Sequence, residues 1–290
     1  MSPGKAEWTV LSMLEWATEY FEKQNISSPR LSIEWLLSHI LEVKRLDLYL
    51  MYDRPLTDVE LSRLRPLVKR RALHEPLQYI TGFTHFMDCK IYVNSTVLIP
   101  RIETEQLIEE LLQRTSHRKN APVRLLDIGT GSGCIPVSIK FYNPHWDCSG
   151  CDISDEAVEL ARKNAKENNV HVTFFKCDLF DLKPVPEPDK WDIIISNPPY
   201  IPPEEKSSVE EQVIKYEPEI ALIHEDPLSV YRAISGYAKQ SLKHDGYLFL
   251  ECNNSLASEI QEVVEHAGFK AETKQDLDKN PRFIIAGNLN

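Results

Sequence analysis

The sequence predicts an α/β fold, a doubly wound and mostly parallel sheet, preceded by a helical segment and a hairpin. From Val123 onward, apolar segments of strand length alternate with segments of helical periodicity, as expected for parallel strands joined by helices. Before Leu73, apolar residues recur near helical spacing instead. Between them, residues rich in β-branched and aromatic side chains predict a hairpin. We therefore expect a helical domain over residues 1–74, a hairpin linker over 75–99 and a larger domain over 100–290.

The strands of the larger domain are predicted from short apolar runs that end at turn-forming or acidic residues. Two further segments near the C-terminus are joined by only Leu277–Pro281, which is too short for a crossover, so these two strands must be antiparallel. The segments that follow Gly133, Asp155, Pro227 and Asn254 are predicted to be helices. The predicted strands are 123–129, 146–153, 172–178, 191–197, 246–252, 270–276 and 282–288.

Composition narrows the class of protein. Hydrophobic residues make up 42% of the 290 residues, enough for a sizeable core, so a disordered chain is excluded. The net charge of −11 argues against broad, sequence-independent binding of nucleic acid, which needs a basic face. No apolar run approaches the roughly 18 residues of a membrane span, and the N-terminus has no signal-peptide pattern. We expect a cytoplasmic enzyme with no membrane partner and no direct nucleic-acid partner.

The sequence gives no indication of a metal site. The nine histidines are scattered and include no H-E-x-x-H pair. Cys148 and Cys151 form a lone C-x-x-C, but they fall in a predicted strand, where positions three apart face opposite sides. We therefore interpret these cysteines as structural and expect no metal ion.

A glycine-rich loop joins the first predicted strand of the larger domain to the next helix. The run LLDIGTGSGC places glycines at 129, 131 and 133, where the backbone can turn sharply and approach a ligand. The helix that follows favours an anionic group at its N-terminus. Asp152 closes the second strand, about 20 residues on, where an acidic residue meets ribose hydroxyls in nucleotide-binding folds. The D-x-G-x-G-x-G spacing differs from the dinucleotide fingerprint and resembles the S-adenosylmethionine loop of class I methyltransferases.

The strand WDIIIS runs directly into Asn197-Pro198-Pro199-Tyr200. In the methyltransferase superfamily this N-P-P-Y motif marks enzymes that methylate a nitrogen of a planar group. An amide nitrogen is a poor nucleophile, so its N–H groups need two acceptors in fixed directions. The side-chain oxygen of Asn197 and the backbone carbonyl of Pro198 fit that role, and the prolines restrict the preceding backbone. We expect the Tyr200 ring to pack on the planar acceptor group.

The chain as a whole resembles the HemK/PrmC-type protein-glutamine methyltransferases, which act on peptide chain release factors. The resemblance rests on EPLQYITG at 75–82, LIPRIETE at 98–105, the glycine-rich loop, NPPYIP and YEP at 216–218. It implies a class I methyltransferase (Rossmann-like) fold with a mostly parallel seven-stranded sheet, a helical N-terminal domain that docks the substrate, and a β-hairpin linker. It also implies S-adenosyl-L-methionine as cofactor and, as acceptor, the glutamine of a Gly-Gly-Gln motif.

The same resemblance implies the site residues. The catalytic residues would be Asn197, Pro198 and Tyr200. The acceptor would also meet Pro199, Arg101 and Glu105. The cofactor would be held by Asp127, Gly129, Thr130, Gly131, Ser132, Gly133, Asp152, Asp178, Leu179 and Asn197.

Four other interpretations remain. The same chemistry could act on a ribosomal-protein glutamine or on adenine in DNA. The fold could also serve as a non-catalytic binding module. An NAD enzyme would leave N-P-P-Y unexplained. The basic residues of the third predicted helix allow two interpretations, a solvated face or a docking surface for an anionic partner; they are Arg63, Arg65, Lys69, Arg70 and Arg71.

Overall fold

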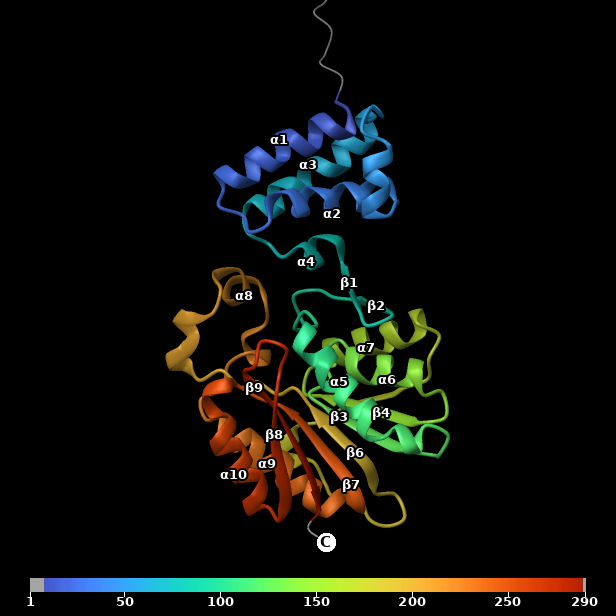
Figure 1. Ribbon diagram of the computed structural model, residues 1–290, viewed down its shortest axis with the longest axis vertical. Coiled ribbons are helices and arrows are strands. Elements are labelled where there is room, and N and C mark those ends of the chain that lie inside the picture. The colour runs from blue at the N-terminus through green and yellow to red at the C-terminus, as the bar shows by residue number, and fades with distance from the viewer. Residues whose placement is uncertain (1–7, 289–290) are drawn as a thin grey trace, which may run out of the picture. The chain divides into compact units, whose positions relative to one another are not determined.

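The computed structural model describes residues 8–288, which form two compact units (Figure 1). The first unit ends at Gly82 and the second begins at Phe83. The short helix α4 (Leu77–Thr81) therefore belongs to the first unit, and the hairpin belongs to the second. The division lies eight residues after the expected end of the helical domain at 74, because α4 packs on the preceding helices.

The first unit is helical, as its periodicity predicted. Its longer helices are α1 (Val10–Lys23), α2 (Pro29–Leu41) and α3 (Asp58–Ala72), with the 3₁₀ helix η1 (Arg45–Leu50) between the last two. Apolar side chains from the three helices form one core, which includes Leu14, Phe21, Ile33, Leu36 and Leu64. At the start of α3, Thr57 and Glu60 form a capping box, in which each side chain accepts from the other residue's backbone N–H.

The basic residues of α3 do not share one environment. Arg71 is buried, with its Nε 3.1 Å from Ser32 Oγ and its Nη1 3.0 Å from the carbonyl oxygen of Glu75. Burial lowers the pKa of the Arg71 guanidinium. Arg70 donates to the Glu75 carboxylate at 2.8 and 2.5 Å. Placing Arg71 on a solvated face or a docking surface was therefore wrong, because its guanidinium joins α3 to α2 inside the unit.

The second unit contains one seven-stranded sheet in the order β5-β4-β3-β6-β7-β9-β8. Strands β3 to β7 are parallel, and β9 pairs antiparallel with both β7 and β8, as the short connection between the last two strands required. The bounds are β3 Arg124–Ile128, β4 Asp147–Asp152, β5 Thr173–Lys176, β6 Trp191–Ser196, β7 Leu242–Glu251, β8 Phe269–Gln275 and β9 Pro281–Asn288.

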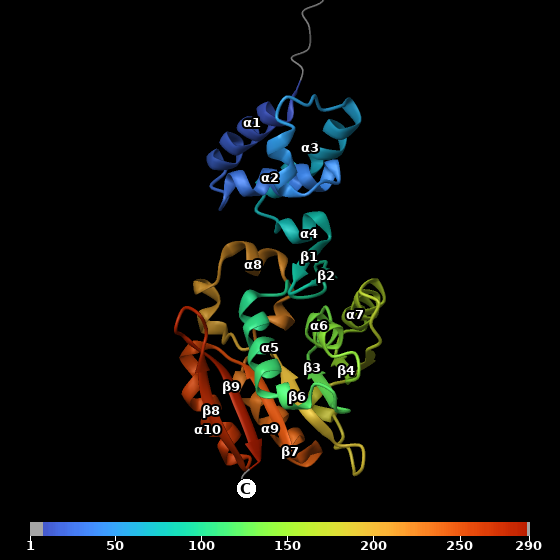
Figure 2. The same cartoon turned by 45° about the vertical axis from the view of Figure 1, so that its right-hand side comes forward.

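Helices cover both faces of this sheet. Figures 1 and 2 both show α9 (Pro227–Ser241) and α10 (Ala257–His266) on one face. The other face carries α5 (Ile102–Arg114), α6 (Cys134–Tyr142) and α7 (Asp155–Glu167). This two-sided cover explains why the parallel strands are so apolar; every residue of β6 is buried. The doubly wound α/β fold expected from the sequence is confirmed.

The hairpin pairs β1 (Phe83–Phe86) with β2 (Cys89–Tyr92) and is held against α7. The Asn164 side chain accepts from Tyr92 N at 2.8 Å and donates to Tyr92 O at 2.9 Å. Asn168 bonds Lys90 in the same way, at 3.1 and 2.8 Å. Two amide side chains one helical turn apart thus satisfy the outer edge of β2, so the hairpin is a fixed part of the second unit.

The chain order reverses at one place in the sheet. From β3 the chain adds β4 and β5 on one side, then returns to place β6 on the other side of β3. Open α/β sheets bind ligands at such a switch point, outside the carboxyl ends of the strands. Both the glycine-rich loop and N-P-P-Y follow strands that meet there.

Over the described residues, no helix is long and apolar enough to cross a membrane.

Candidate active site

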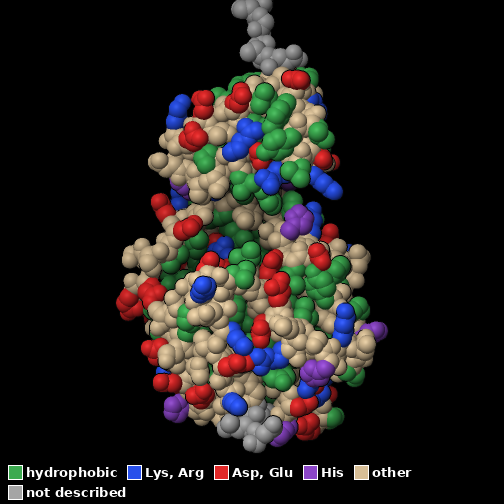
Figure 3. All heavy atoms as spheres, viewed as in Figure 1, with side chains coloured by type: hydrophobic (Ala, Val, Ile, Leu, Met, Phe, Trp, Pro, Cys, Tyr) green, Lys and Arg blue, Asp and Glu red, His purple; other side chains and the backbone are tan. Residues whose placement is uncertain are grey.

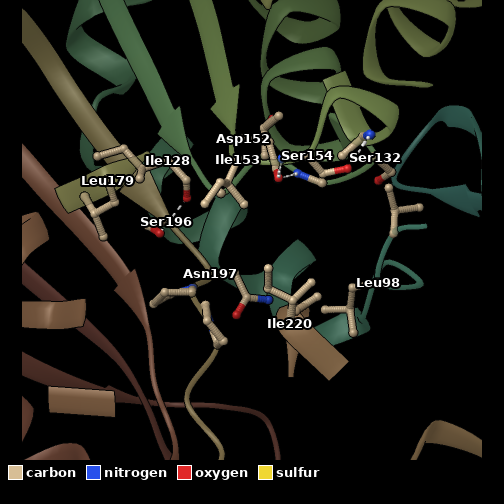
Figure 4. Close-up of a pocket in the computed structure, with 18 of the residues that line it drawn as sticks. Leu98, Ile128, Ser132, Asp152, Ile153, Ser154, Leu179, Ser196, Asn197 and Ile220 are labelled. Atoms are coloured by element: carbon tan, nitrogen blue, oxygen red, sulfur yellow. Dashed lines mark hydrogen bonds between the residues drawn. The ribbon is translucent and has the colours of Figure 1, made fainter. Parts of the chain in front are cut away.

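A cavity of about 440 Å³ lies at the switch point, a volume typical of small-ligand sites. In Figure 4, Asn197 lies across this cavity from Asp152 and Ser154. The wall combines the loops after four parallel strands with three other segments, one before and at the start of α5, one before α9 and one in α9. It is formed by 96–98, 100–101, Thr104, 128–132, 134–135, 152–154, Ala157, 177–180, 196–199, 220–221, 223–224, Val230 and Ile234.

The glycine-rich loop is shaped by positive φ angles and by one carboxylate. Gly129 and Gly131 have φ of 74° and 53°, and a Cβ built on either meets no atom within 4 Å, so their backbone faces open space. Gly133, at φ 75°, is different: a Cβ there would lie 2.8 Å from Ala161 Cβ. Asp152 Oδ2 accepts from Gly131 N at 2.8 Å. The loop is therefore set for backbone contact with a ligand on one side and for tight helix packing on the other.

A buried carboxylate lies beside this loop. Asp127 lies within β3 and is fully buried. Neither of its carboxylate oxygens is hydrogen bonded within the described part of the chain. The Thr130 hydroxyl is likewise unsatisfied there. Burial raises the pKa of Asp127 to about 7, and the nearby Asp152 charge adds to the rise. An acid left without partners next to a cavity is a group that a cationic ligand would stabilise.

The loop after β5 forms another part of the wall. Asp178 Oδ1 accepts from Phe180 N at 2.9 Å, which starts a 3₁₀ turn and brings Asp178 and Leu179 to the cavity. The Phe180 side chain is 59% exposed, and its ring lies 6.4 Å from the His224 ring. The two rings come from different loops and both line the cavity, so they mark its mouth.

N-P-P-Y places three of its four residues in the wall. Asn197, Pro198 and Pro199 line the cavity, whereas Tyr200 does not. Asn197 Nδ2 donates to Thr104 Oγ1 at 3.1 Å, and Thr104 Oγ1 donates to Glu251 Oε2 at 2.7 Å. The Tyr200 hydroxyl donates to Glu251 Oε1 at 3.4 Å. The motif is therefore anchored by its Asn and Tyr side chains to one buried carboxylate at the end of β7.

The segment between N-P-P-Y and α9 folds back over the cavity as a closed loop. Ile201 N donates to Leu222 O at 3.0 Å and His224 N donates to Ile201 O at 3.1 Å, so its two ends are paired. Between them are two 3₁₀ turns and the short helix α8 (Glu211–Tyr216). The buried Glu217 carboxylate accepts from Ile99 N at 3.0 Å and from Arg101 Nη2 at 2.5 Å. These bonds fasten the loop to the segment that precedes α5.

The cavity brings together most of the residues expected from the sequence. Those in its wall are Arg101, Gly129, Thr130, Gly131, Ser132, Asp152, Asp178, Leu179, Asn197, Pro198 and Pro199. Asp127, Gly133 and Tyr200 lie next to it in the packing beneath the loops. Glu105 is placed elsewhere: its Oε1 accepts from Met87 N at 2.6 Å, in the hairpin turn where Met87 has φ 49°. One residue along a helix turns the side chain by about 100°, so Thr104 faces the cavity and Glu105 faces the hairpin.

Two residues of this network were not among the expected site residues. Thr104 lies within the motif LIPRIETE, and Glu251 is the only acid in the apolar run GYLFLEC. A lone acid in a buried strand was a usable signal, because an unpaired charge is rarely buried without a role. Across residues 8–288 no group of three or more His, Cys, Asp or Glu is placed to hold a metal ion.

The Arg101–Glu217 pair generates a prediction about the loop. In Arg101→Gln, the buried Glu217 carboxylate loses a charge-assisted bond worth roughly 1.5–3 kcal/mol, so the loop should open more readily. We expect hydrogen exchange at the amides of 201–224 to become about tenfold faster or more, measured by mass spectrometry. The control is Lys206→Gln, which breaks the exposed Lys206–Glu219 pair and should change exchange little. Equal exchange in wild type and Arg101→Gln would contradict this account of how the loop is held.

Comparison with known proteins agrees with this arrangement. The family model described as PrmC N-terminal domain matches residues 12–82, and that described as methyltransferase small domain matches 102–225. A release factor glutamine methyltransferase of Geobacter sulfurreducens is 38% identical, over 97% of each chain. Another, of Leptospira interrogans, is 34% identical over 96% of this chain and 97% of its own.

Solved structures share the fold at low sequence identity. The hMettl16 catalytic domain, solved in complex with a MAT2A 3′UTR hairpin, matches with a TM-score of 0.55 at 16% identity, over 81% of this chain and 82% of that one. A methyltransferase from Pyrococcus furiosus matches with a TM-score of 0.50 at 17% identity, over 78% and 97%. These two show the class I methyltransferase fold alone. The near full-length relatives and the two family models show more: this chain belongs to the release factor glutamine methyltransferase family.

Proposed function

We propose that this protein transfers a methyl group from S-adenosyl-L-methionine to the side-chain amide nitrogen of the glutamine in the Gly-Gly-Gln motif of peptide chain release factors. One observation carries the proposal: the Asn197 carboxamide and the glycine-rich loop line the same cavity. Asn197 provides a hydrogen-bond acceptor for an amide, and the glycine-rich loop provides backbone N–H groups for a cofactor. The names of the near full-length relatives supply the release factor and its glutamine.

The residues present fit the cofactor. A carboxylate would be favoured by the N-terminus of α6 and by the loop N–H groups. An ammonium would neutralise the buried, unpartnered Asp127. Asp152, at the end of β4, is placed for ribose hydroxyls, and Ile153 and Leu179 offer apolar surface for a base. When bound, S-adenosylmethionine supplies an electrophilic methyl group.

The protein's part in the reaction is to orient the acceptor. The glutamine amide nitrogen is a weak nucleophile because its lone pair is delocalised. Asn197 Oδ1 and the Pro198 carbonyl would accept its two N–H groups and stabilise the positive charge that develops on nitrogen. A base is not needed beforehand, since the proton can leave after transfer. Tyr200 would help to hold the motif through its hydroxyl, which donates to Glu251 at 3.4 Å, and packing of its ring on the acceptor stays a prediction.

The helical first unit would dock the release factor. Its surface exposes large apolar side chains, notably Leu46, Tyr49 and Leu50 on η1, at 70%, 48% and 88% exposure. Exposed apolar surface of this kind suits a protein partner. Nucleic acid is disfavoured by the net charge, and Figure 3 shows acidic and basic side chains intermixed on the face it draws.

Mass spectrometry tests the acceptor directly. After incubation of a full-length release factor with this protein and S-adenosylmethionine, we expect a gain of one methyl group on the Gly-Gly-Gln glutamine. The same factor with that glutamine replaced by alanine should stay unmodified. Methylation of duplex DNA or of a ribosomal protein, with none of the release factor, would replace this proposal with one of the two alternative acceptors.

Asp152 generates a prediction about cofactor binding. In Asp152→Asn, a charge-assisted bond to the ribose is lost, so affinity for S-adenosylmethionine should fall by about one to two decades, as expected for roughly 1.5–3 kcal/mol. Calorimetry measures the affinity. The control is Asp155→Asn, whose carboxylate pairs with Lys176 on the surface and should not matter. Unchanged binding in Asp152→Asn would show that the ribose is held by other groups.

Asn197 generates a prediction about turnover. Asn197→Ala removes one preorganised acceptor, so kcat for the release factor should fall by about 10²–10³-fold while cofactor affinity changes little. Single-turnover kinetics at saturating cofactor measure the loss. Asn254→Ala, at an exposed position just beyond β7, is the matched control. A folded Asn197→Ala protein with near wild-type turnover would remove Asn197 from the mechanism.

A further inference from the structure

We propose that Thr104 and Glu251 are positioning residues that decide which way the Asn197 carboxamide faces. This inference rests on the proposed function, in which the oxygen of that carboxamide must point at the acceptor. Thr104 comes from α5 and Glu251 from the end of β7, far from Asn197 in the sequence. Neither residue needs to touch the acceptor for this role.

The direction of each hydrogen bond follows from which group carries the proton. An ionised carboxylate can only accept, so the Thr104 hydroxyl must donate its single proton to Glu251, at 2.7 Å. The Thr104 oxygen then has only lone pairs left for Asn197. A carboxamide presents NH₂ on one side and oxygen on the other, so Asn197 must turn its Nδ2 toward Thr104, at 3.1 Å. Its Oδ1 is thereby directed away from Thr104, as an acceptor for the substrate.

A neutral Glu251 would lose this control. A protonated carboxyl can donate to Thr104, whose own proton is then released toward Asn197. That arrangement favours the flipped carboxamide, with oxygen toward Thr104 and NH₂ toward the acceptor. Two N–H groups would then face each other, and the site would lose an acceptor. The charge on Glu251 therefore fixes the polarity of the chain from Glu251 through Thr104 to Asn197.

Glu251 is held in an environment that makes its charge costly. It is 1% exposed, and within residues 8–288 no salt bridge engages it. Arg282 on β9 acts on Glu251 by its charge, but it is bonded to Asp276 at 3.3 Å and to the Cys252 carbonyl. A buried acid without an ion pair is unfavourable for stability, which argues that it is kept for the site. The titratable and charged groups around it are Glu103 on α5, Cys134 on α6, Tyr200 after β6, Tyr231 on α9, Cys252 after β7 and Arg282 on β9.

The series of hydrogen bonds from Glu251 through Thr104 to Asn197 predicts a pH dependence of turnover with a defined sign. Burial raises the pKa of Glu251 from 4.5 to about 7, with the Thr104 bond and Arg282 acting against the rise. Turnover at saturating cofactor should therefore increase as pH rises through about 7, where Glu251 ionises. The same ionisation is unfavourable for folding, so stability supplied by the neutral form is lost between pH 4.5 and 7. The pKa of Asp127 is also raised to about 7, but Asp127 lies in β3 beside the glycine-rich loop, so its ionisation should affect cofactor affinity rather than saturated turnover.

The test compares Glu251→Gln, Thr104→Val and Thr104→Ser in the full-length protein. Glu251→Gln keeps the shape but can donate, so kcat should fall about tenfold, with KM for the release factor and cofactor affinity little changed. Its turnover should also lose the rise near pH 7, and above that pH it should be at least as stable as wild type. The kcat of Thr104→Val should fall as far as that of Glu251→Gln or further. Thr104→Ser should keep most of the wild-type kcat, because the hydroxyl alone makes the hydrogen bonds.

A second readout is independent of turnover. In wild type, the Asn197 side-chain NH₂ signals, seen by NMR with selective asparagine labelling, should show one slowly exchanging proton and should titrate near pH 7. Thr104→Val should lose the slow exchange, and Glu251→Gln should lose the titration. An unchanged Asn197 signal in both variants would overturn the inference, as would Glu251→Gln with wild-type kcat and pH profile. If wild type leaves the release factor unmethylated, the proposed function fails, while the NMR arm still decides the orientation of Asn197.

Discussion

The pairing of β3 with β6 is the constraint on which the rest of the site depends. Ile128 and Ser196, the last residues of the two strands, stand opposite each other, and Ser196 Oγ donates to Ile128 O at 2.6 Å. Because the strands are parallel, the glycine-rich loop and N-P-P-Y leave the sheet at the same edge. In the proposed reaction, a methyl donor held by the glycine-rich loop would then reach an amide held by N-P-P-Y. The chain reversal at this pair leaves room for both ligands.

Two buried carboxylates without an ion pair in the described chain, Asp127 and Glu251, lie next to residues that line the cavity, and both are unfavourable for folding when ionised. Burial raises the pKa of Asp127 and of Glu251 to about 7 in each case. Neither acid makes a salt bridge with any residue between 8 and 288. Acids of this kind are a common feature of functional sites, where the protein loses some stability to place a charge. Asp127 lies beside the glycine-rich loop, and Glu251 is bonded to the residues that hold N-P-P-Y. These positions match the two halves of the proposed reaction, cofactor binding and acceptor binding.

The remaining wall of the cavity is held by polar contacts to loops, and not by the sheet. Glu217 joins the loop after N-P-P-Y to Ile99 and Arg101, and Glu205 accepts from Asn253 Nδ2 at 2.9 Å and Ser255 Oγ at 3.0 Å. Such contacts can break and reform without disturbing the core. The carboxyl ends of the strands thus carry the residues proposed to react, while a loop fastened at a few points covers them.

The fold and most of the cavity wall could be predicted from the amino-acid sequence, because strand and helix periods are local and glycine and proline patterns act on their own backbone. The sequence also placed Asp152, Asn197 and Pro198 at strand ends, where function concentrates. Tertiary structure alone decided which side chains support them. Thr104 and Glu251 reach Asn197 from two other elements, Glu105 turns to the hairpin, and Arg71 is buried between helices. Contacts of this kind depend on how segments far apart in the sequence pack together, and the residue pattern within one segment does not specify that packing.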